Sequence, residues 1–184
     1  MLMRPDLQIK SILKAMTDVV LPAIDPDNPL AQEQARLCMG MLGLMAAQLP
    51  QQFRYDCDEL QRLVALSRQV QGLPGMAALA PEALSTIGAL TGRAADVLSR
   101  ARAEPAEVLQ AVRELRAATG QVVQEAFAND VRGECTEALQ HAVMQASQAQ
   151  LLRERSWVLM QGWEADPQAV PAIETLIAPV SASA

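Results

Sequence analysis

The densest group of side chains with chemical potential lies at residues 54–59, where the sequence reads RYDCDE. Three carboxylates, those of Asp56, Asp58 and Glu59, are present in this segment. Tyr55 adds a phenol, and a desolvated acidic group there could act as a general acid or base. A helix start has the same composition, because Asp56 can cap a helix and Glu59 can complete a capping box. We favour this structural interpretation, since no other segment supplies converging partners, and an enzyme that uses Tyr55, Asp56 and Glu59 is the third hypothesis for function.

The histidine content excludes the metal centre that helical bundles most often hold. Di-iron bundles place Glu-x-x-His motifs on two helices, and His141 is the single histidine of the chain. Glu134 and Glu137 fall on the same helical face as His141, which allows at most a weak surface metal contact across a dimer. We expect no metal site and no cofactor, with His141 partly exposed beside a helix-stabilising carboxylate.

The cysteines do not indicate nucleophilic catalysis. Cys38, Cys57 and Cys135 are odd in number and far apart, which argues against a disulfide framework and a paired-thiol zinc site. We expect three reduced thiols, at least one of them buried, with Cys38 packed as a small hydrophobic side chain in an apolar run. No serine, histidine and acid set can be nominated, and no glycine-rich phosphate loop is present. The sequence therefore nominates no catalytic residue.

Methionines supply the candidate ligand-binding residues. Met39, Met41 and Met45 stand close together in the chain, and Met16 belongs to the preceding helix. Flexible thioether side chains can line a pocket for an apolar ligand or a docking groove for a partner helix. Ordinary core filling is the favoured interpretation, because only 3% of the residues are aromatic. Binding of an acyl or other apolar ligand between the first two helices is the second hypothesis for function.

Composition and charge exclude several classes of protein. Hydrophobic residues make up 51% of the chain and the formal net charge is -6. The basic residues are scattered, so nucleic-acid binding and attraction to an anionic membrane are disfavoured. The longest dense apolar run, residues 37–47, is too short to span a bilayer, and the first residues lack the apolar stretch of a secretory signal. These features predict no membrane span and a cytoplasmic location.

Apolar residues recur every three to four positions, which predicts an all-α helical bundle of about six helices with a long C-terminal helix. Pro5 and Asp6 suit a helix start, Pro22 should end that helix, and Asn28 with Pro29 should open the next. Asp58 and Arg62 are expected as an exposed pair four residues apart. The expected helices cover residues 5–21, 29–49, 56–70, 81–102, 105–128 and 134–163.

The chain is expected to form a single helical domain over residues 1–184. Residues 71–81 contain two glycines and two prolines, which makes this segment the candidate boundary between two lobes, a three-helix lobe over 1–70 and a helical lobe over 81–178. Gly40, Gly43 and Ala47 are expected to form a small-residue groove that another backbone approaches closely. The last helix carries a repeat of 3.5 residues that is small at its centre and polar towards its end, a pattern suited to close antiparallel packing. The residues of this repeat are Cys135, Leu139, Ala142, Ala146, Ala149, Arg153, Ser156 and Met160.

The opening RPDLQIKSILKAMTDVVLPAIDP, followed by AQEQARLCMGMLGLM, resembles a group of uncharacterised bacterial helical proteins. The genes of that group lie near aminoglycoside-phosphotransferase-like kinases and acyl-CoA dehydrogenases. The shared features are an amphipathic first helix ending in VLPAI and a second helix that starts after an Asp/Asn/Pro turn. The resemblance covers about the first third of the chain. It implies an accessory role in acyl-group or lipid catabolism, and it assigns no catalytic residue.

The first hypothesis for function is a non-catalytic accessory protein that binds a protein partner or a second copy of itself. A polar-rich final helix and the lack of a converging catalytic set favour this hypothesis over an enzyme.

Overall fold

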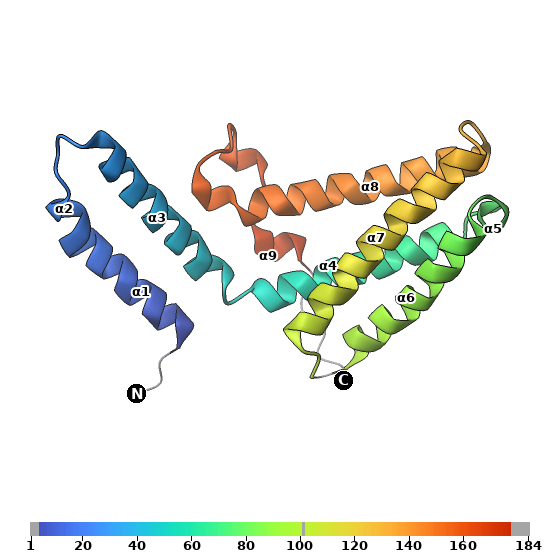
Figure 1. Cartoon of the computed structure of the whole chain (residues 1–184), viewed down its shortest axis with the longest axis horizontal. Helices are drawn as coiled ribbons and strands as arrows, with labels where there is room; N and C mark the ends of the chain where they lie inside the picture. The colour runs from blue at the N-terminus through green and yellow to red at the C-terminus, as the bar shows by residue number, and fades with distance from the viewer. Residues whose placement is uncertain (1–3, 101, 178–184) are drawn as a thin grey trace. The chain divides into compact units, whose positions relative to one another are not determined.

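Figure 1 shows the computed structural model, which describes residues 4–100 and 102–177. Every regular element within these two ranges is helical, which confirms the all-α prediction. The expected number of about six helices is a little low. Two of the additional helices are single turns, α5 (Met76–Leu79) and α9 (Ile173–Leu176). Four-residue helices escape a periodicity argument because they do not complete two turns.

The chain divides into two compact units, which are described one at a time. The first unit, called here the hairpin unit, comprises Met1–Gln52 and Glu154–Ile173. The second, called the core unit, comprises Phe53–Arg153 and Glu174–Ala184. These bounds differ from the expected lobes 1–70 and 81–178. The glycine- and proline-rich segment 71–81 lies inside the core unit, where Met76 and Ala80 are fully buried.

The first helix of the hairpin unit runs past the proline that was expected to end it. Helix α1 (Pro5–Ala15) continues through a π-helical segment (Met16–Val20) into α2 (Leu21–Ala23), which contains Pro22. Proline lacks a backbone N–H and its ring crowds the carbonyl four residues earlier. A π-helical turn is wider than an α-helical turn and so accommodates that ring.

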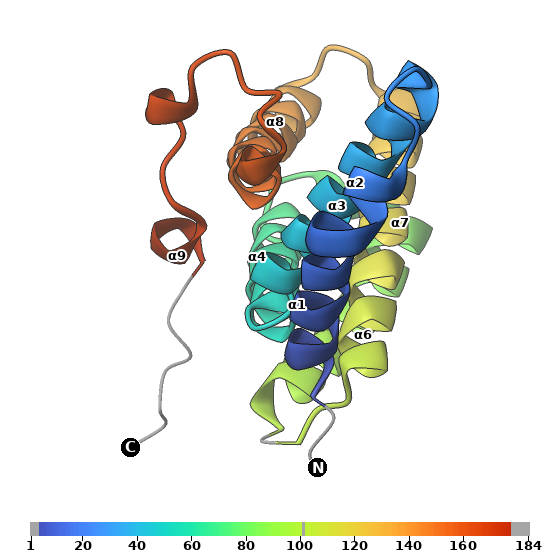
Figure 2. The same ribbon diagram turned by 90° about the vertical axis from the view of Figure 1, so that its left-hand side faces the viewer.

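Helix α3 (Pro29–Gln48) begins where the sequence predicted. The side chain of Asn28 accepts a hydrogen bond from the backbone N–H of Ala31 at 3.1 Å, which caps the helix. Helices α1 and α3 form an antiparallel hairpin and lie side by side in Figure 2. The contact is partial, because Leu13 of α1 and Met16 of the π-helical segment are only half-buried and neither segment contains a buried residue.

The C-terminal part of the hairpin unit packs on the end of α3. Gln48 donates a hydrogen bond to the backbone carbonyl of Trp157 at 3.0 Å. The guanidinium of Arg155 donates to both carboxylate oxygens of Glu164 at 2.9 and 2.8 Å, which holds the turn after α8 in place. These hydrogen bonds lower the pKa of the Glu164 carboxyl.

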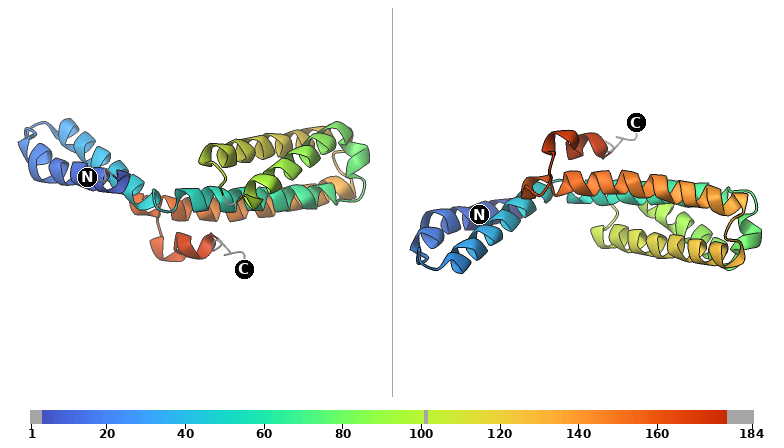
Figure 3. Two further views of the ribbon diagram at one scale, coloured as in Figure 1. Left: turned by 90° about the horizontal axis from the view of Figure 1, so that it is seen from below. Right: turned by 90° about the horizontal axis from the view of Figure 1, so that it is seen from above.

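The core unit is a bundle of four long helices around one apolar core. They are α4 (Gln52–Gln71), α6 (Pro81–Ser99), α7 (Pro105–Asn129) and α8 (Glu134–Trp157), of which the last passes into the hairpin unit at residue 154. Helices α6 and α7 lie side by side in Figures 1 and 3 and are in extensive contact. The fully buried apolar side chains come from every long helix of the bundle and include Leu60, Val70, Ile87, Val108, Leu115, Val122 and Leu139.

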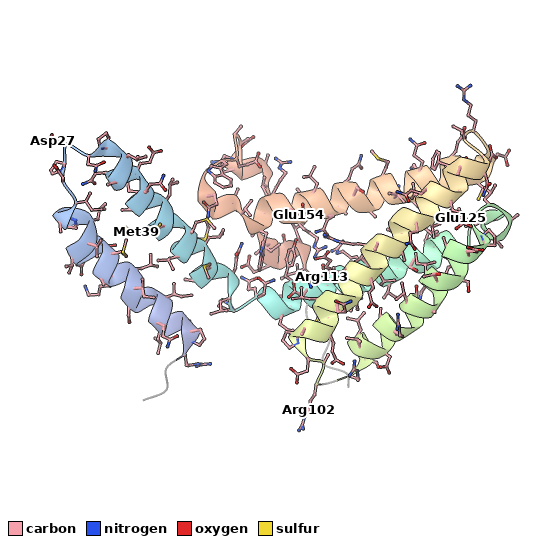
Figure 4. The ribbon with its side chains drawn as sticks, viewed as in Figure 1. Asp27, Met39, Arg102, Arg113, Glu125 and Glu154 are labelled. Atoms are coloured by element: carbon pink, nitrogen blue, oxygen red, sulfur yellow. The ribbon has the colours of Figure 1, made fainter. Side chains whose placement is uncertain are left out.

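Helix starts in the core unit are capped by acidic side chains. Glu104 and Glu107 form a capping box at the start of α7. Glu125, in the second half of α7, accepts a hydrogen bond from the backbone N–H of Ala83 at 3.0 Å and so caps α6 from a neighbouring helix (Figure 4). Such carboxylates favour the positive end of the helix dipole.

None of the helices in residues 4–100 and 102–177 is both long and apolar enough to cross a membrane.

The core of the bundle can be tested at α7. We expect Leu115→Ala to lower the free energy of unfolding by about 3 kcal/mol, because Leu115 exposes 0% of its surface and the substitution leaves a cavity. Leu109→Ala on the same helix is the matched control, since Leu109 is 36% exposed and a change below about 1 kcal/mol is expected. Urea unfolding followed by circular dichroism measures both, and equal losses would contradict the assignment of the buried face.

Candidate functional site

The RYDCDE segment lies inside α4 and not at its start. The helix begins at Gln52, directly after a short turn in which the N–H of Gln51 donates to the carbonyl of Gln48 at 2.9 Å. The predicted capping box of Asp56 and Glu59 is therefore wrong, since both residues lie beyond the first turn. Pro50 ends α3, and the turn that follows it is too short to leave an unwound segment before Asp56.

Burial distinguishes this segment from an ordinary polar face. Tyr55, Asp56, Asp58 and Glu59 expose only 6%, 5%, 6% and 8% of their surfaces. Charged residues are rarely buried to this extent unless they are paired. The role of this segment therefore depends on which groups pair with its buried side chains.

Arg153 of α8 is the central partner. Its residue exposure is 1%, and its guanidinium lies 4.7 Å from the centroid of the Tyr55 ring. It donates to the side chain of Gln150 at 2.7 Å and to the backbone carbonyl of Tyr55 at 3.4 Å. Nε lies 3.2 Å from Oδ2 of Asp58, a contact that is an ion pair and not an aligned hydrogen bond. The guanidinium is thus bound by groups of the same unit on several sides.

Two further arginines complete the cluster. Arg62 donates to Oδ2 of Asp58 at 2.8 Å, so the predicted pair is formed, although Asp58 is buried and not exposed as expected. Arg116 of α7 forms an ion pair with Glu59. We call Tyr55, Asp58, Glu59 and the three arginines 62, 116 and 153 the arginine cluster. It joins α4 to α7 and α8 within the core unit.

Arg62 of the cluster and the neighbouring Arg54 also anchor the last described residues of the core unit. Arg54 donates to the backbone carbonyl of Ile177 at 2.8 Å, and Arg62 donates to that of Leu176 at 2.7 Å. The side chain of Ile177 is buried, with an exposure of 2%. Backbone carbonyls after a short helix need donors, and these two arginines supply them.

This geometry supports a structural role and not acid/base catalysis. A catalytic carboxylate must reach a substrate, whereas Asp58 and Glu59 are buried against arginines of their own unit. The donors of Arg153 likewise point to Gln150 and to Tyr55. The third hypothesis, an enzyme that uses Tyr55, Asp56 and Glu59, gains no support from this arrangement.

The four candidate methionines do not converge on one pocket. Met39 lies on the side of α3 that faces α1 (Figure 4), where Met16 is also half-buried. Met41 and Met45 lie on a different side of α3 and are 50% and 51% exposed. The Met41 sulfur is 3.7 Å from the side-chain nitrogen of Gln161. Two of the four therefore line the α1–α3 contact and two face outward.

An apolar groove exists instead in the core unit, between α6 and α7. Its volume is about 350 Å³, which is near the lower end of the range for small-ligand sites. Arg93 and Glu114 lie on its rim, 3.5 Å apart as an ion pair. Its apolar lining consists of Leu90, Ala94, Val97, Ala106 and Ala111.

The cysteines differ in exposure. Cys38 is exposed, so its predicted place in the core is wrong. Cys57 and Cys135 are half-buried. Burial is the main cause that raises the pKa of the Cys57 thiol, and the negative charge of Asp56 adds to it. The pKa of the Cys135 thiol is likewise raised, mainly by burial and to a smaller extent by the charge of Asp130.

His141 is exposed and its ring nitrogen lies 3.4 Å from the side-chain nitrogen of Gln145. Throughout residues 4–100 and 102–177, no three His, Cys, Asp or Glu side chains are placed to hold a metal ion.

Arg153 was not predicted as the centre of the cluster. The available signal was its place in the 3.5-residue repeat of the last helix, where a charged residue stands at a position that should be buried. A charge at such a position requires a buried partner, and the acidic segment of α4 was the only dense supply of carboxylates in the chain.

The cluster can be tested by removing its central charge. We expect Arg153→Met to lower the free energy of unfolding by about 3 kcal/mol or more, because Asp58 loses one of two cationic partners in a buried setting. Arg113→Met on α7 is the control, since Arg113 is exposed (Figure 4) and the effect should stay within about 0.5 kcal/mol. Adding Asp58→Asn to Arg153→Met should recover part of the loss in urea unfolding; a fully additive loss would contradict the direct pairing.

Thiol reactivity follows from the same burial and pKa directions. A maleimide reagent at pH 7.5 should modify Cys38 first, because only a thiolate that the reagent can reach reacts. Since their pKa values are raised, Cys57 and Cys135 should continue to gain reactivity above pH 9, where an ordinary thiol levels off. Mass spectrometry of the time course measures this, and Cys38→Ser should abolish the fast phase. A fast phase that persists in Cys38→Ser would contradict the assignment.

In comparisons with known proteins, no family model, no curated protein and no solved structure matches this chain. The resemblance of residues 4–45 to a bacterial group therefore stays a prediction.

Proposed function

We propose that this protein acts by binding another protein chain through the hairpin of α1 and α3, and not by catalysis. The observation that carries the proposal is that the hairpin unit has almost no core of its own. Among its described residues only three apolar side chains are buried, those of Ala35, Leu44 and Val170.

The core unit provides the contrast within the same chain. It contains a continuous apolar core with fully buried members, such as Leu60, Ile87 and Leu139, each with an exposure of 0%. Helices gain most of their stability in water from packing an apolar face. The hairpin unit carries such faces, but the contacts inside that unit leave them uncovered.

The uncovered residues form two stripes at helical spacing. On α3, Leu37, Met41 and Met45 recur every four residues and are 51%, 50% and 51% exposed; we call them the α3 stripe. On the first helix, Ile12 and Val19 are 48% and 65% exposed, and together with Val20 they form the α1 stripe. Amphipathic partner helices bind such stripes, and methionine adapts to varied partners.

The glycines of α3 support the same proposal. Each glycine inside a helix costs about 1 kcal/mol relative to alanine. A methyl group added at Gly40 or Gly43 would meet nothing within 4 Å. Packing inside the hairpin unit therefore does not require glycine at either position, whereas close approach of a helix from a partner chain would.

A second candidate function is the binding of an apolar small ligand. The observation that favours it is the groove between α6 and α7 in the core unit, and not the predicted methionine pocket between the first two helices. The groove is open and small, so it would enclose a drug-sized ligand only in part.

Site-specific photocrosslinking in the native cell tests the protein-binding proposal. A benzophenone amino acid placed at Leu37 should give covalent protein adducts on illumination, and Met41→Glu in the same chain should reduce them at least fivefold by placing a charge in the interface. The same amino acid at Arg113 is the control for random collision, because that residue is exposed on the core unit. If adducts at Leu37 do not exceed those at Arg113, the proposal is wrong.

A further inference from the structure

We propose that the core unit carries a peptide-binding site on α4 and that its occupant in this structure is a segment of the same chain. The occupant is residues 174–177, where the chain returns to the core unit; we call it the return segment. A segment of a partner protein with the same chemistry replaces it when the partner binds. This site belongs to the core unit, so it does not depend on the function proposed for the hairpin.

The return segment is held in the way that proteins hold a bound peptide. Arg62 donates to the backbone carbonyl of Leu176 at 2.7 Å, and Arg54 donates to that of Ile177 at 2.8 Å. These two bonds recognise the main chain and not a side chain. The side chain of Ile177 supplies an apolar anchor, with an exposure of 2%. Main-chain hydrogen bonds that give affinity, together with a pocket for a side chain that gives specificity, are a recurring mode of peptide recognition.

The donor of Arg62 is positioned by groups outside the return segment. Its Nε donates to Oδ2 of Asp58 at 2.8 Å, while its Nη2 donates to the carbonyl of Leu176. Asp58 is buried and is also paired with Arg153 of α8. These contacts hold the guanidinium of Arg62 in place whether or not the return segment is bound, and a preorganised donor lowers the cost of binding. The side chain of Arg62 is 45% exposed, so a partner can reach it.

The return segment can leave without disturbing the core of the bundle. Helix α9 contains no buried residue, and Glu174 and Thr175 are exposed. A helix of one turn has little stability of its own in water. Residues 174–176 lie on the side of α4 that faces away from α6 and α7 (Figures 2 and 3). Segments with few buried contacts open separately from the core, so release of this segment does not require the bundle to unfold.

The charges indicate which partner segment fits the site. Glu174 precedes the apolar anchor Ile177 by three positions, and α4 presents two arginines to this part of the chain. The partner segment is therefore a short helical turn with an acidic residue three positions before a branched apolar one, because opposite charges favour the correct register. The tethered return segment competes at an effective concentration on the order of millimolar. The contact is thus autoinhibitory, and a partner must displace it.

Fluorescence anisotropy with the full chain tests the site. The probe is a labelled peptide of residues 172–178, AIETLIA, capped at both ends. Ile177→Asp in the full chain should release its own segment, so the peptide should bind at least tenfold more tightly than to the natural chain. Val131→Asp is the matched control, because it makes the same kind of change at a residue of the core unit that is 66% exposed, and it should bind the peptide as the natural chain does. Adding Arg54→Gln to Ile177→Asp should remove the gain.

Two results would overturn the proposal. One is an equal affinity of the peptide for the natural chain and for a folded Ile177→Asp chain. The other is an unchanged affinity when the peptide itself carries Ile177→Asp, because the anchor would then contribute nothing.

A second measurement decides the question if circular dichroism shows that Ile177→Asp has lost its helices. In the full chain, Ile177→Cys places a thiol at the anchor, and Leu115→Cys places one in the core, where the natural residue is 0% exposed. Maleimide should label position 177 at least tenfold faster than position 115, since only the second requires the bundle to open. Mass spectrometry of the digested chain separates these positions from the natural cysteines, and equal labelling rates would show that the return segment does not detach.

Discussion

Removing the charge of Arg153 from water is the constraint on which the packing of α4 and α8 depends. A buried guanidinium without partners costs several kcal/mol, so α8 must lie where Asp58, Gln150 and the carbonyl of Tyr55 surround it. Asp58 in turn fixes Arg62, which holds the carbonyl of Leu176. One charge at an otherwise apolar position therefore sets the register of two helices and the course of the chain that follows them.

The two units satisfy the same physical requirement to different degrees. The core unit has a continuous buried apolar core, and polar side chains pair within it, as in the hydrogen bonds of Gln71 to Ser67 and Thr91. The hairpin unit has well-formed helices with a good cap at Asn28, yet its apolar stripes remain exposed. Local helix signals are satisfied in both, and only tertiary burial separates them.

This difference bears on how the protein would respond to a partner. A partner that binds only the folded hairpin stabilises it by mass action, so folding of the hairpin and binding are linked. The core unit has no such requirement, because its own contacts fill its interior. In the function proposed above, the bundle carries a hairpin whose exposed apolar stripes a partner would cover. The buried arginine cluster holds α4 against α7 and α8 within the bundle.

The sequence by itself determined the helices. Spacing of apolar residues predicted an all-α chain, and Asn28 with Pro29 predicted the start of α3, because caps and periodicity depend on neighbours within a few positions. The start of α4 and the course of the chain through Pro22 were missed, since a short turn and a wider helical turn leave no clear local signal. Only the tertiary structure decided that Asp58 and Glu59 are buried in ion pairs, that residues 71–81 lie inside a unit, and that Cys38 and Met41 face outward. Those properties depend on which residues far apart in the chain become neighbours, and a period of 3.6 residues contains no information about that.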